Sequence, residues 1–223
     1  MKKINKLLMT TAIVAFAFSA AANAQVSVKN FAGPSVEVGV QATKTKLTLG
    51  PDTYNGLPVG ISEINRNHTD YLPKLSAQYG FETPVNNLVI GLGASYTPGT
   101  SSVHFNTYGE SSEFTKINRA KSLYIQPMYA LNEATAIFGK LSYNKVDSKV
   151  YFNGADDLYA IGSKTISGKG LGAGVTHFVT KDLFLKAEIE SIYYGNNAYD
   201  TYFDLYEAKT QQTNSTISLG FKF

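Results

Sequence analysis

The residues best able to do chemistry in this sequence are three histidines, and their spacing argues against a metal site. They are His68, His104 and His177, which lie far apart along the chain, and the sequence contains no cysteine. Zinc ligands are cysteine and histidine residues at short, defined spacings, which are missing here. The adjacent acids Asp156 and Asp157 also lack the alternate spacing of a calcium-binding loop. We therefore expect no bound metal.

A glycine-rich run at 168–173, GKGLGA, matches the Gly-x-Gly-x-x-Ala fingerprint of dinucleotide-binding sites. That fingerprint needs a helix after it, whose N-terminus holds the pyrophosphate. The residues that follow here, GVTHFVTKD, read instead as a strand and a turn. We therefore expect no cofactor, and we interpret the glycines as strand residues that face a crowded interior.

One group of charged residues is more informative because of the strand pattern in which it sits. Lys186, Glu188 and Glu190 alternate with apolar neighbours, so a β-strand would place all three charges on one face. The same alternation recurs in eight segments: 36–42, 71–82, 88–96, 123–129, 137–144, 170–176, 185–193 and 217–223. The sequence therefore predicts an all-β protein with eight strands.

The connections between these segments alternate in length. Three are short, at 83–87, 131–134 and 179–182, and four are long, at about 50–68, 98–118, 147–163 and 195–209. In an up-and-down antiparallel sheet, successive connections lie at opposite ends of the strands. All the tight turns should therefore lie at one end and all the long loops at the other.

The first 24 residues have the three parts of an export signal. A basic start, MKKINK, is followed by an apolar run at 7–18 and an A-x-A cleavage site at 22–24. We expect cleavage after Ala24, export through the Sec pathway, and one domain over 25–223. Removing the three lysines of the signal leaves 17 of the 20 basic residues, which equals the number of acidic residues. This balance gives no argument for nucleic-acid binding.

The period of two does not say which solvent the apolar face meets. A soluble barrel places apolar residues inside, and a transmembrane barrel places them outside. Glycines at 91, 93, 170, 172 and 174 suit a narrow lumen, and the apolar sets end in Tyr and Phe, as interfacial girdles do. A closed barrel also satisfies its backbone in lipid without disulfides. We predict a membrane barrel, with a bulge or a membrane border at Pro73 and Pro127.

The sequence resembles the small eight-stranded outer-membrane proteins of Gram-negative bacteria, the OmpA/OmpX and opacity-type surface barrels. The resemblance rests on the signal peptide, on GKGLGAGVTHFVTKDLFLKAEI at 168–189 and on the ending TISLGFKF. It implies an eight-stranded antiparallel up-and-down transmembrane β-barrel with three short periplasmic turns and four long extracellular loops. It also implies contact with outer-membrane lipid and lipopolysaccharide. Phe221 and Phe223 would be the signal that the barrel-assembly machinery reads.

The sequence predicts two further groups of candidate functional residues. The first is a lumen charge cluster of Lys74, Lys140, Lys186, Glu188, Glu190 and Lys222. The second is a contact surface on the long loops, made of Tyr54, Tyr108, Tyr151, Phe152, Tyr159, Tyr199 and Tyr202. Alternatively, the long connections continue as β-ribbons in which these aromatic residues pack across strands.

These features favour a non-enzymatic role in envelope structure or in surface contact, with an unidentified ligand or host protein. A small porin-like channel, a soluble periplasmic ligand-binding barrel and a lipid A-modifying barrel enzyme remain alternatives. The enzyme family is similar in carrying an H-x-S strand motif, whereas His177 is followed by Phe178 and Val179. We therefore assign no catalytic, cofactor-binding or metal-binding residue.

Overall fold

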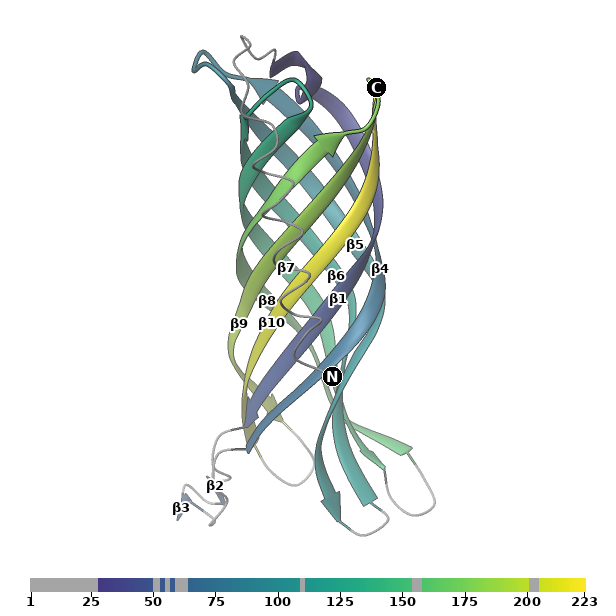
Figure 1. Cartoon of the computed structure of the whole chain (residues 1–223). Coiled ribbons are helices and arrows are strands. Elements are labelled where there is room, and N and C mark those ends of the chain that lie inside the picture. The colour runs from purple at the N-terminus through teal and green to yellow at the C-terminus, as the bar shows by residue number, and fades with distance from the viewer. Residues whose placement is uncertain are drawn as a thin grey trace, which may run out of the picture.

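Eight long antiparallel strands close into a barrel in up-and-down order (Figure 1). The computed structural model describes residues 28–49, 53–54, 57–58, 64–108, 111–153, 158–200 and 205–223, so the predicted signal peptide lies outside the described residues. The barrel strands are β1 (Gly33–Leu49), β4 (Ile64–Glu82), β5 (Leu88–Tyr108), β6 (Ser111–Ala130), β7 (Thr135–Asn153), β8 (Leu158–Phe178), β9 (Leu183–Asp200) and β10 (Leu205–Lys222). The pairing of β10 with β1 closes the barrel.

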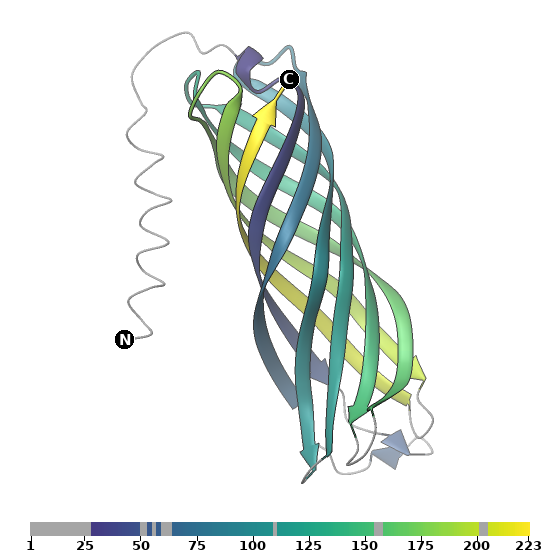
Figure 2. The same cartoon turned by 90° about the vertical axis from the view of Figure 1, so that its right-hand side faces the viewer.

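Three smaller elements complete the described part of the chain. The two-residue strands β2 (Thr53–Tyr54) and β3 (Leu57–Pro58) form a separate small sheet. A 3-10 turn, η1 (Val28–Asn30), precedes β1 and lies at the same end of the barrel as the C-terminus (Figure 2). No described helix has the length and hydropathy needed to cross a bilayer.

The three predicted short connections are confirmed at 83–87, 131–134 and 179–182. They lie together at one end of the barrel, called here the turn end, and the strand ends that the four longer connections join lie at the opposite, ribbon end (Figure 1). The strands continue much further toward the ribbon end than the alternation predicts. Most of the predicted loop 98–118 is strand, because β5 and β6 keep pairing up to Tyr108 and Ser111. Continued pairing satisfies backbone groups that a loop would leave to water.

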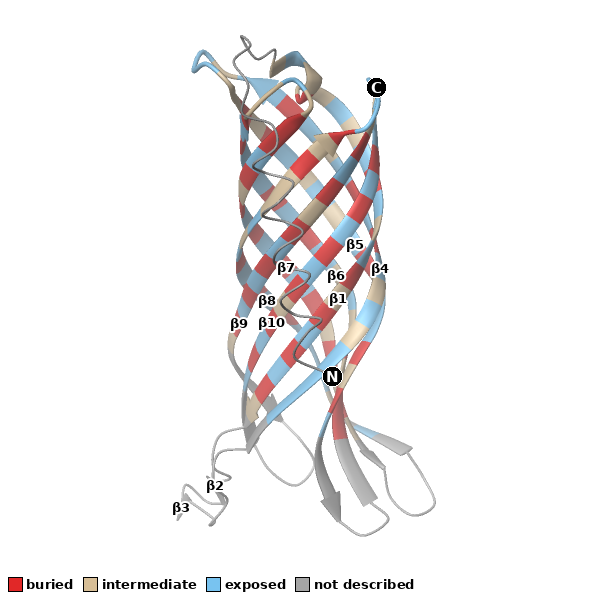
Figure 3. Cartoon of the chain, in the orientation of Figure 1, coloured by how far each residue is buried: buried red, intermediate tan, exposed pale blue. Residues whose placement is uncertain are grey.

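Apolar side chains cover the outside of the barrel wall. Exposed residues alternate with buried ones along each strand (Figure 3). The outward residues at the centre of the wall are Val, Leu, Ile and Ala, as in Val38, Leu141 and Ile189. Toward the ribbon end they give way to Tyr71, Tyr96, Tyr143 and Tyr193, and toward the turn end to Tyr79, Phe81, Tyr129, Phe221 and Phe223. An apolar belt flanked by two girdles of aromatic residues is typical of the exterior of a transmembrane barrel. It does not fit the exterior of a soluble barrel.

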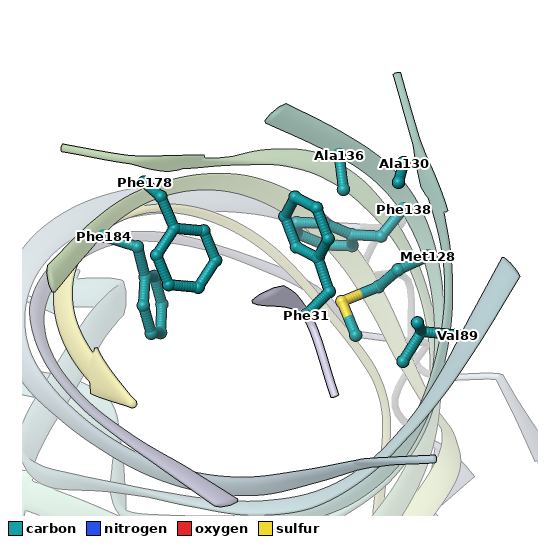
Figure 4. Close-up of a cluster of buried hydrophobic side chains, with 8 residues drawn as sticks. All are labelled: Phe31, Val89, Met128, Ala130, Ala136, Phe138, Phe178 and Phe184. Atoms are coloured by element: carbon teal, nitrogen blue, oxygen red, sulfur yellow. The ribbon is translucent and has the colours of Figure 1, made fainter. Parts of the chain in front are cut away.

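The inside of the barrel is filled by side chains in layers. Near the turn end, a turn-side apolar layer consists of Phe31, Val89, Met128, Ala130, Ala136, Phe138, Phe178 and Phe184 (Figure 4). Nearer the ribbon end, a ribbon-side apolar layer consists of Ile117, Val146, Ile166, Ile192 and Tyr194. Inward glycines make room for the large rings. A Cβ on Gly220 would lie 2.1 Å from Phe184, and one on Gly93 would lie 2.4 Å from Tyr124.

Neither Pro73 in β4 nor Pro127 in β6 lies at a register shift. Pro73 lies opposite Val40 of β1, and on its other side the β4–β5 ladder ends nearby at the pair Leu75–Tyr96. Pro127 lies in a gap of the β6–β7 ladder, between the pairs Ile125–Leu141 and Met128–Phe138. Because proline has no N–H to donate, each occupies a place where the ladder is interrupted. No bulge lies at Pro73 or Pro127. Each lies two residues from a tyrosine that ends the apolar belt, Tyr71 and Tyr129, so the membrane border that we expected at each stays a prediction.

Candidate functional site in the charged interior

Six charged side chains meet inside the barrel between the two apolar layers. Strand β9 supplies Lys186, Glu188 and Glu190, whose even-numbered positions all face inward, as the alternation predicts. The other three come from β4, β7 and β1 and are Lys74, Lys140 and Glu37. All six are buried, and Lys140 is only 2% exposed. An isolated buried charge is strongly unfavourable, so the energetics of this group depend on how the charges pair.

The pairing forms one connected network of short contacts. Glu188 Oε1 accepts hydrogen bonds from the Nζ atoms of Lys74 and Lys140, both at 2.9 Å. Lys140 Nζ also donates to Glu190 Oε2 at 3.0 Å. Lys186 Nζ donates to Glu37 Oε1 at 3.0 Å and lies 4.0 Å from Glu188 Oε2. Three lysines thus balance three glutamates, and the network as a whole carries no net charge.

Neutral side chains complete the coordination of these charges. Lys186 Nζ donates a further hydrogen bond to Gln126 Oε1 at 3.0 Å. Ser142 donates to Glu190, and Asn144 Nδ2 donates to Ser142 Oγ at 2.7 Å. The Tyr124 ring lies under two ammonium groups, with Lys140 Nζ at 4.7 Å and Lys186 Nζ at 5.8 Å from its centroid. Such cation–π contacts add to the stabilisation of the buried lysines.

The structure brings together five residues of the predicted lumen cluster, which are Lys74, Lys140, Lys186, Glu188 and Glu190. Lys222 does not join them. It is the last residue of β10, at the turn end, where its Nζ donates to the backbone carbonyl of Lys29. Position along the strand, and not only the face of the strand, decides which charges meet.

Sequence reasoning missed Glu37 and Gln126. Glu37 alternates with the outward residues Val36 and Val38, so its inward position was readable. A single acid among valines gave no sign that it would face Lys186 across the barrel, because that contact depends on the stagger between strands.

The histidines are dispersed, as expected from their spacing. His68 Nε2 lies 3.2 Å from Asp70 Oδ1 on the ribbon-end part of β4. The His104 ring lies 4.9 Å from the Phe114 ring. His177 Nδ1 and Thr135 Oγ1 share a hydrogen bond of 2.9 Å near the turn end. Within the described ranges, no three potential ligands are grouped to hold a metal ion; Asp156 and Asp157 lie outside those ranges.

The predicted loop aromatic residues lie mostly on strand backbone. Tyr151 stacks on Phe114 across the β6–β7 ribbon, with ring centroids 5.3 Å apart and planes 11° apart. The backbones of Tyr54, Tyr108, Phe152, Tyr159 and Tyr199 belong to paired strands. Tyr202 lies outside the described residues. The described parts therefore follow the alternative in which the long connections continue as ribbons.

The two C-terminal phenylalanines lie on the outer wall at the turn end. Their rings form an edge-to-face pair with centroids 5.2 Å apart, and Phe223 remains 70% exposed. The Phe223 N–H donates to the Pro34 carbonyl at 3.1 Å, so pairing with β1 continues to the last residue.

Comparison with known proteins gives a family and a fold. Residues 10–223 match the model of the family described as outer membrane protein beta-barrel domain. No curated protein sequence matches. Among solved structures, the outer membrane protein OprG of Pseudomonas aeruginosa is similar with a TM-score of 0.62 at 13% identity, over 86% of this chain and 96% of that one.

Two further solved structures are similar. The outer membrane protease OmpT of Escherichia coli has a TM-score of 0.52 at 11% identity, over 85% of this chain and 96% of that one. The attachment invasion locus protein Ail of Yersinia pestis has a TM-score of 0.39 at 15% identity, over 84% and 98% of the two chains. At these identities, the likeness concerns the fold alone.

Proposed function

Because this chain belongs to the outer membrane protein beta-barrel domain family and lies in the outer membrane of a Gram-negative bacterium, we propose that it is a non-enzymatic barrel with a filled lumen that serves envelope structure and surface contact. The turn end faces the periplasm, and the ribbon end faces the cell exterior. The observation that carries the proposal is the filled interior, which leaves the outward surfaces to make contact with other molecules.

The interior leaves little space for a permeating solute. The cavity at the periplasmic end, lined by Glu37, Gln126 and Lys186 among others, holds about 20 Å³, which is room for about one water molecule. The charge network borders this cavity, and the two apolar layers lie on either side of the network. An eight-stranded barrel is just wide enough for side chains to fill, and here they do fill it.

The extracellular ribbons supply the surface for contact. Strands β5 to β8 extend well beyond the tyrosines that end the apolar belt, as paired hairpins. On this ribbon the half-buried Tyr151 stacks on the buried Phe114, and the exposed His104 lies beside Phe114. Tyrosine and other aromatic residues among small polar ones are typical of adaptable recognition surfaces.

Among the described residues of the interior, none is arranged in a way that favours a reaction. His177, the residue that a lipid A-modifying enzyme would need as its base, lies near the periplasmic end with Thr135 as its partner. Lipid A belongs to the opposite leaflet. We therefore place the activity of the protein in binding.

A crossed experiment tests the proposal with two variants and two measurements. In the trimmed variant, each of the segments 105–113 and 152–159 is replaced by an Asn-Gly turn. Each turn joins two residues that pair with each other on neighbouring strands, so the interior stays intact. In the interior variant, Glu188 and Glu190 are replaced by Ala. The measurements are steady conductance in planar bilayers and adhesion of expressing cells to epithelial monolayers, with plain polystyrene as the control surface.

We expect the native and trimmed barrels not to conduct, and the interior variant to conduct because unpaired lysines draw water into the lumen. Adhesion should fall several-fold in the trimmed variant and stay unchanged in the interior variant. Ohmic conductance of the native barrel that changes with Glu188 and Glu190 would instead support the channel alternative. Full adhesion by the trimmed variant would remove the proposed role of the ribbons.

A further inference from the structure

The chain segment that precedes β1 crosses the opening at the turn end of the barrel, called here the periplasmic mouth. The segment consists of η1 and the two residues after it, 28–32, and is called here the strap (Figure 2). Asn30 Nδ2 donates to the Glu133 carbonyl at 2.8 Å, in the connection between β6 and β7. The strap continues into β1 at Gly33, and β7 lies four strands from β1 in either direction around the closed barrel. The strap therefore reaches from one side of the mouth to the other.

One side chain of the strap enters the lumen as a stopper. Phe31 is 6% exposed, and its ring meets the Phe178 ring edge to face, with centroids 5.3 Å apart. Among the described residues of the turn-side apolar layer, Phe31 alone lies outside the barrel strands (Figure 4). It also lines the periplasmic cavity, together with Glu37 and Lys186 of the charge network. The ring therefore closes this cavity toward the periplasm.

The wall beneath the strap is shaped to receive it. Gly80 of β4 is buried, and a Cβ there would lie 2.3 Å from the Phe31 carbonyl oxygen and 3.2 Å from Ala32 Cα. The strap backbone thus rests directly on this glycine, and a larger residue would push it away. Gly33 lets the chain turn from the strap into β1, because its φ of +97° is a conformation that other residues rarely adopt.

Apart from the Phe31 ring, the strap is held by exposed contacts. The Asn30 bond to Glu133 is exposed, and so is the hydrogen bond that Lys222 Nζ donates to the Lys29 carbonyl. Exposed hydrogen bonds add little stability, because water competes for the same groups. The burial of one ring must therefore offset the entropy cost of ordering the strap backbone. A terminal segment held in this way opens before the rest of the barrel does.

We propose that the strap is a gate for the periplasmic mouth. It swings out about Gly33 and opens the lumen to water and small solutes as far as the charge network. In the open state, Phe178 faces solvent, and the solvent reaches the Lys186–Glu37 pair, whose Nζ and Oε1 atoms lie 3.0 Å apart. The gate rests on the proposed filled lumen, because the network and the ribbon-side apolar layer must stop solutes there. The open mouth is therefore a pocket and not a pore.

Thiol labelling tests the gate, because the chain has no cysteine of its own. The reporter is Thr176→Cys, at a position that lines the periplasmic cavity and is 5% exposed. The folded barrel in nanodiscs is treated with a charged, membrane-impermeant methanethiosulfonate reagent, and mass spectrometry follows the rate of modification. A heat-modifiable gel shift verifies that every variant is folded.

Two substitutions unseat the strap in different ways, and a third is their control. Phe31→Ala removes the stopper ring, whereas Gly80→Ala keeps the ring and blocks the place on which the strap rests. Gly139→Ala makes the same change on β7, where the added Cβ meets only Pro127 at 3.9 Å. We expect the first two to raise the labelling rate about tenfold or more, since the burial that holds the strap is lost, and the control to change it less than about twofold. Equal rates in Gly80→Ala and Gly139→Ala, or native labelling as fast as in Phe31→Ala, would overturn the gate.

A second reporter separates the gate from the filled lumen. Ser122→Cys lies on β6, two residues beyond Tyr124 toward the ribbon end, and the Ser122 hydroxyl has no hydrogen-bond partner among the described residues. Its thiol should be modified slowly in the native barrel and in both strap variants, because the charge network stays in place between it and the mouth. Rapid modification at Ser122 in the native barrel would contradict the filled lumen, whereas the rates at Thr176 decide the gate.

Discussion

At the residue scale, the lumen network predicts a large loss of stability when a lysine that bonds to two glutamates is removed. Lys140 donates to both Glu188 and Glu190, and its side chain is 1% exposed. Replacing it with Met keeps the volume but leaves two buried carboxylates with one fewer donor each. We expect a loss of about 3–5 kcal/mol in the free energy of unfolding. Urea titration in detergent, followed by tyrosine fluorescence and by the gel shift, measures it.

A second substitution separates charge balance from packing. Adding Glu188→Gln to Lys140→Met restores an equal number of buried positive and negative charges, so part of the lost stability should return. Lys222→Ala, at the periplasmic rim, should cost less than about 1 kcal/mol, as solvent-accessible pairs do. A Lys222 effect as large as that of Lys140 would contradict the layered interior. The sequence indicated which residues face inward, but depth along the strands decided that Lys222 is excluded and Glu37 is included.

At the scale of elements, the barrel wall has an incomplete seam between β4 and β5. Their ladder ends at Leu75–Tyr96, and the following residues include Pro73 on β4 and Pro98 on β5, which cannot donate. Beyond the seam, β4 pairs with β1 alone. We expect about half of the backbone amides at 64–72 to exchange hydrogen with solvent quickly, because no strand covers that edge.

Hydrogen exchange in nanodiscs checks this expectation, with 114–118 of β6 as the matched segment, which lies toward the same end and pairs with both β5 and β7. Equal protection of the two segments would show that the seam is covered. The eight strands and the three tight turns were predictable from alternation and turn residues. The strand ends were not, because the ribbon segments are rich in Asn, Thr and Lys and pair without an apolar face to mark them.

At the scale of the whole molecule, closure and the inverted pattern were readable from the sequence. The alternation in TISLGFKF predicted a strand over 217–223, and β10 pairs with β1 through this segment. Gly, Lys and Glu lie on one face of the strands, and Val, Leu and Tyr lie on the other. This division predicted that the apolar face meets lipid and the other face meets the lumen. The neutral network and the two apolar layers were not readable, because they depend on which residues of eight tilted strands reach the same depth.

The last residue gives a prediction about assembly as distinct from stability. Phe223 donates a backbone hydrogen bond to Pro34, and its exposed ring contacts that of Phe221. Deleting it should therefore hardly change refolding of the purified barrel into detergent, where no machinery is present. In cells, the same deletion should lower insertion several-fold if Phe223 is part of the signal that the assembly machinery reads. A one-residue deletion in the connection 154–157 should leave both measurements near native. Equal insertion of the two variants in cells, measured by the fraction of gel-shifted protein in the outer membrane, would show that the terminal aromatic is not read.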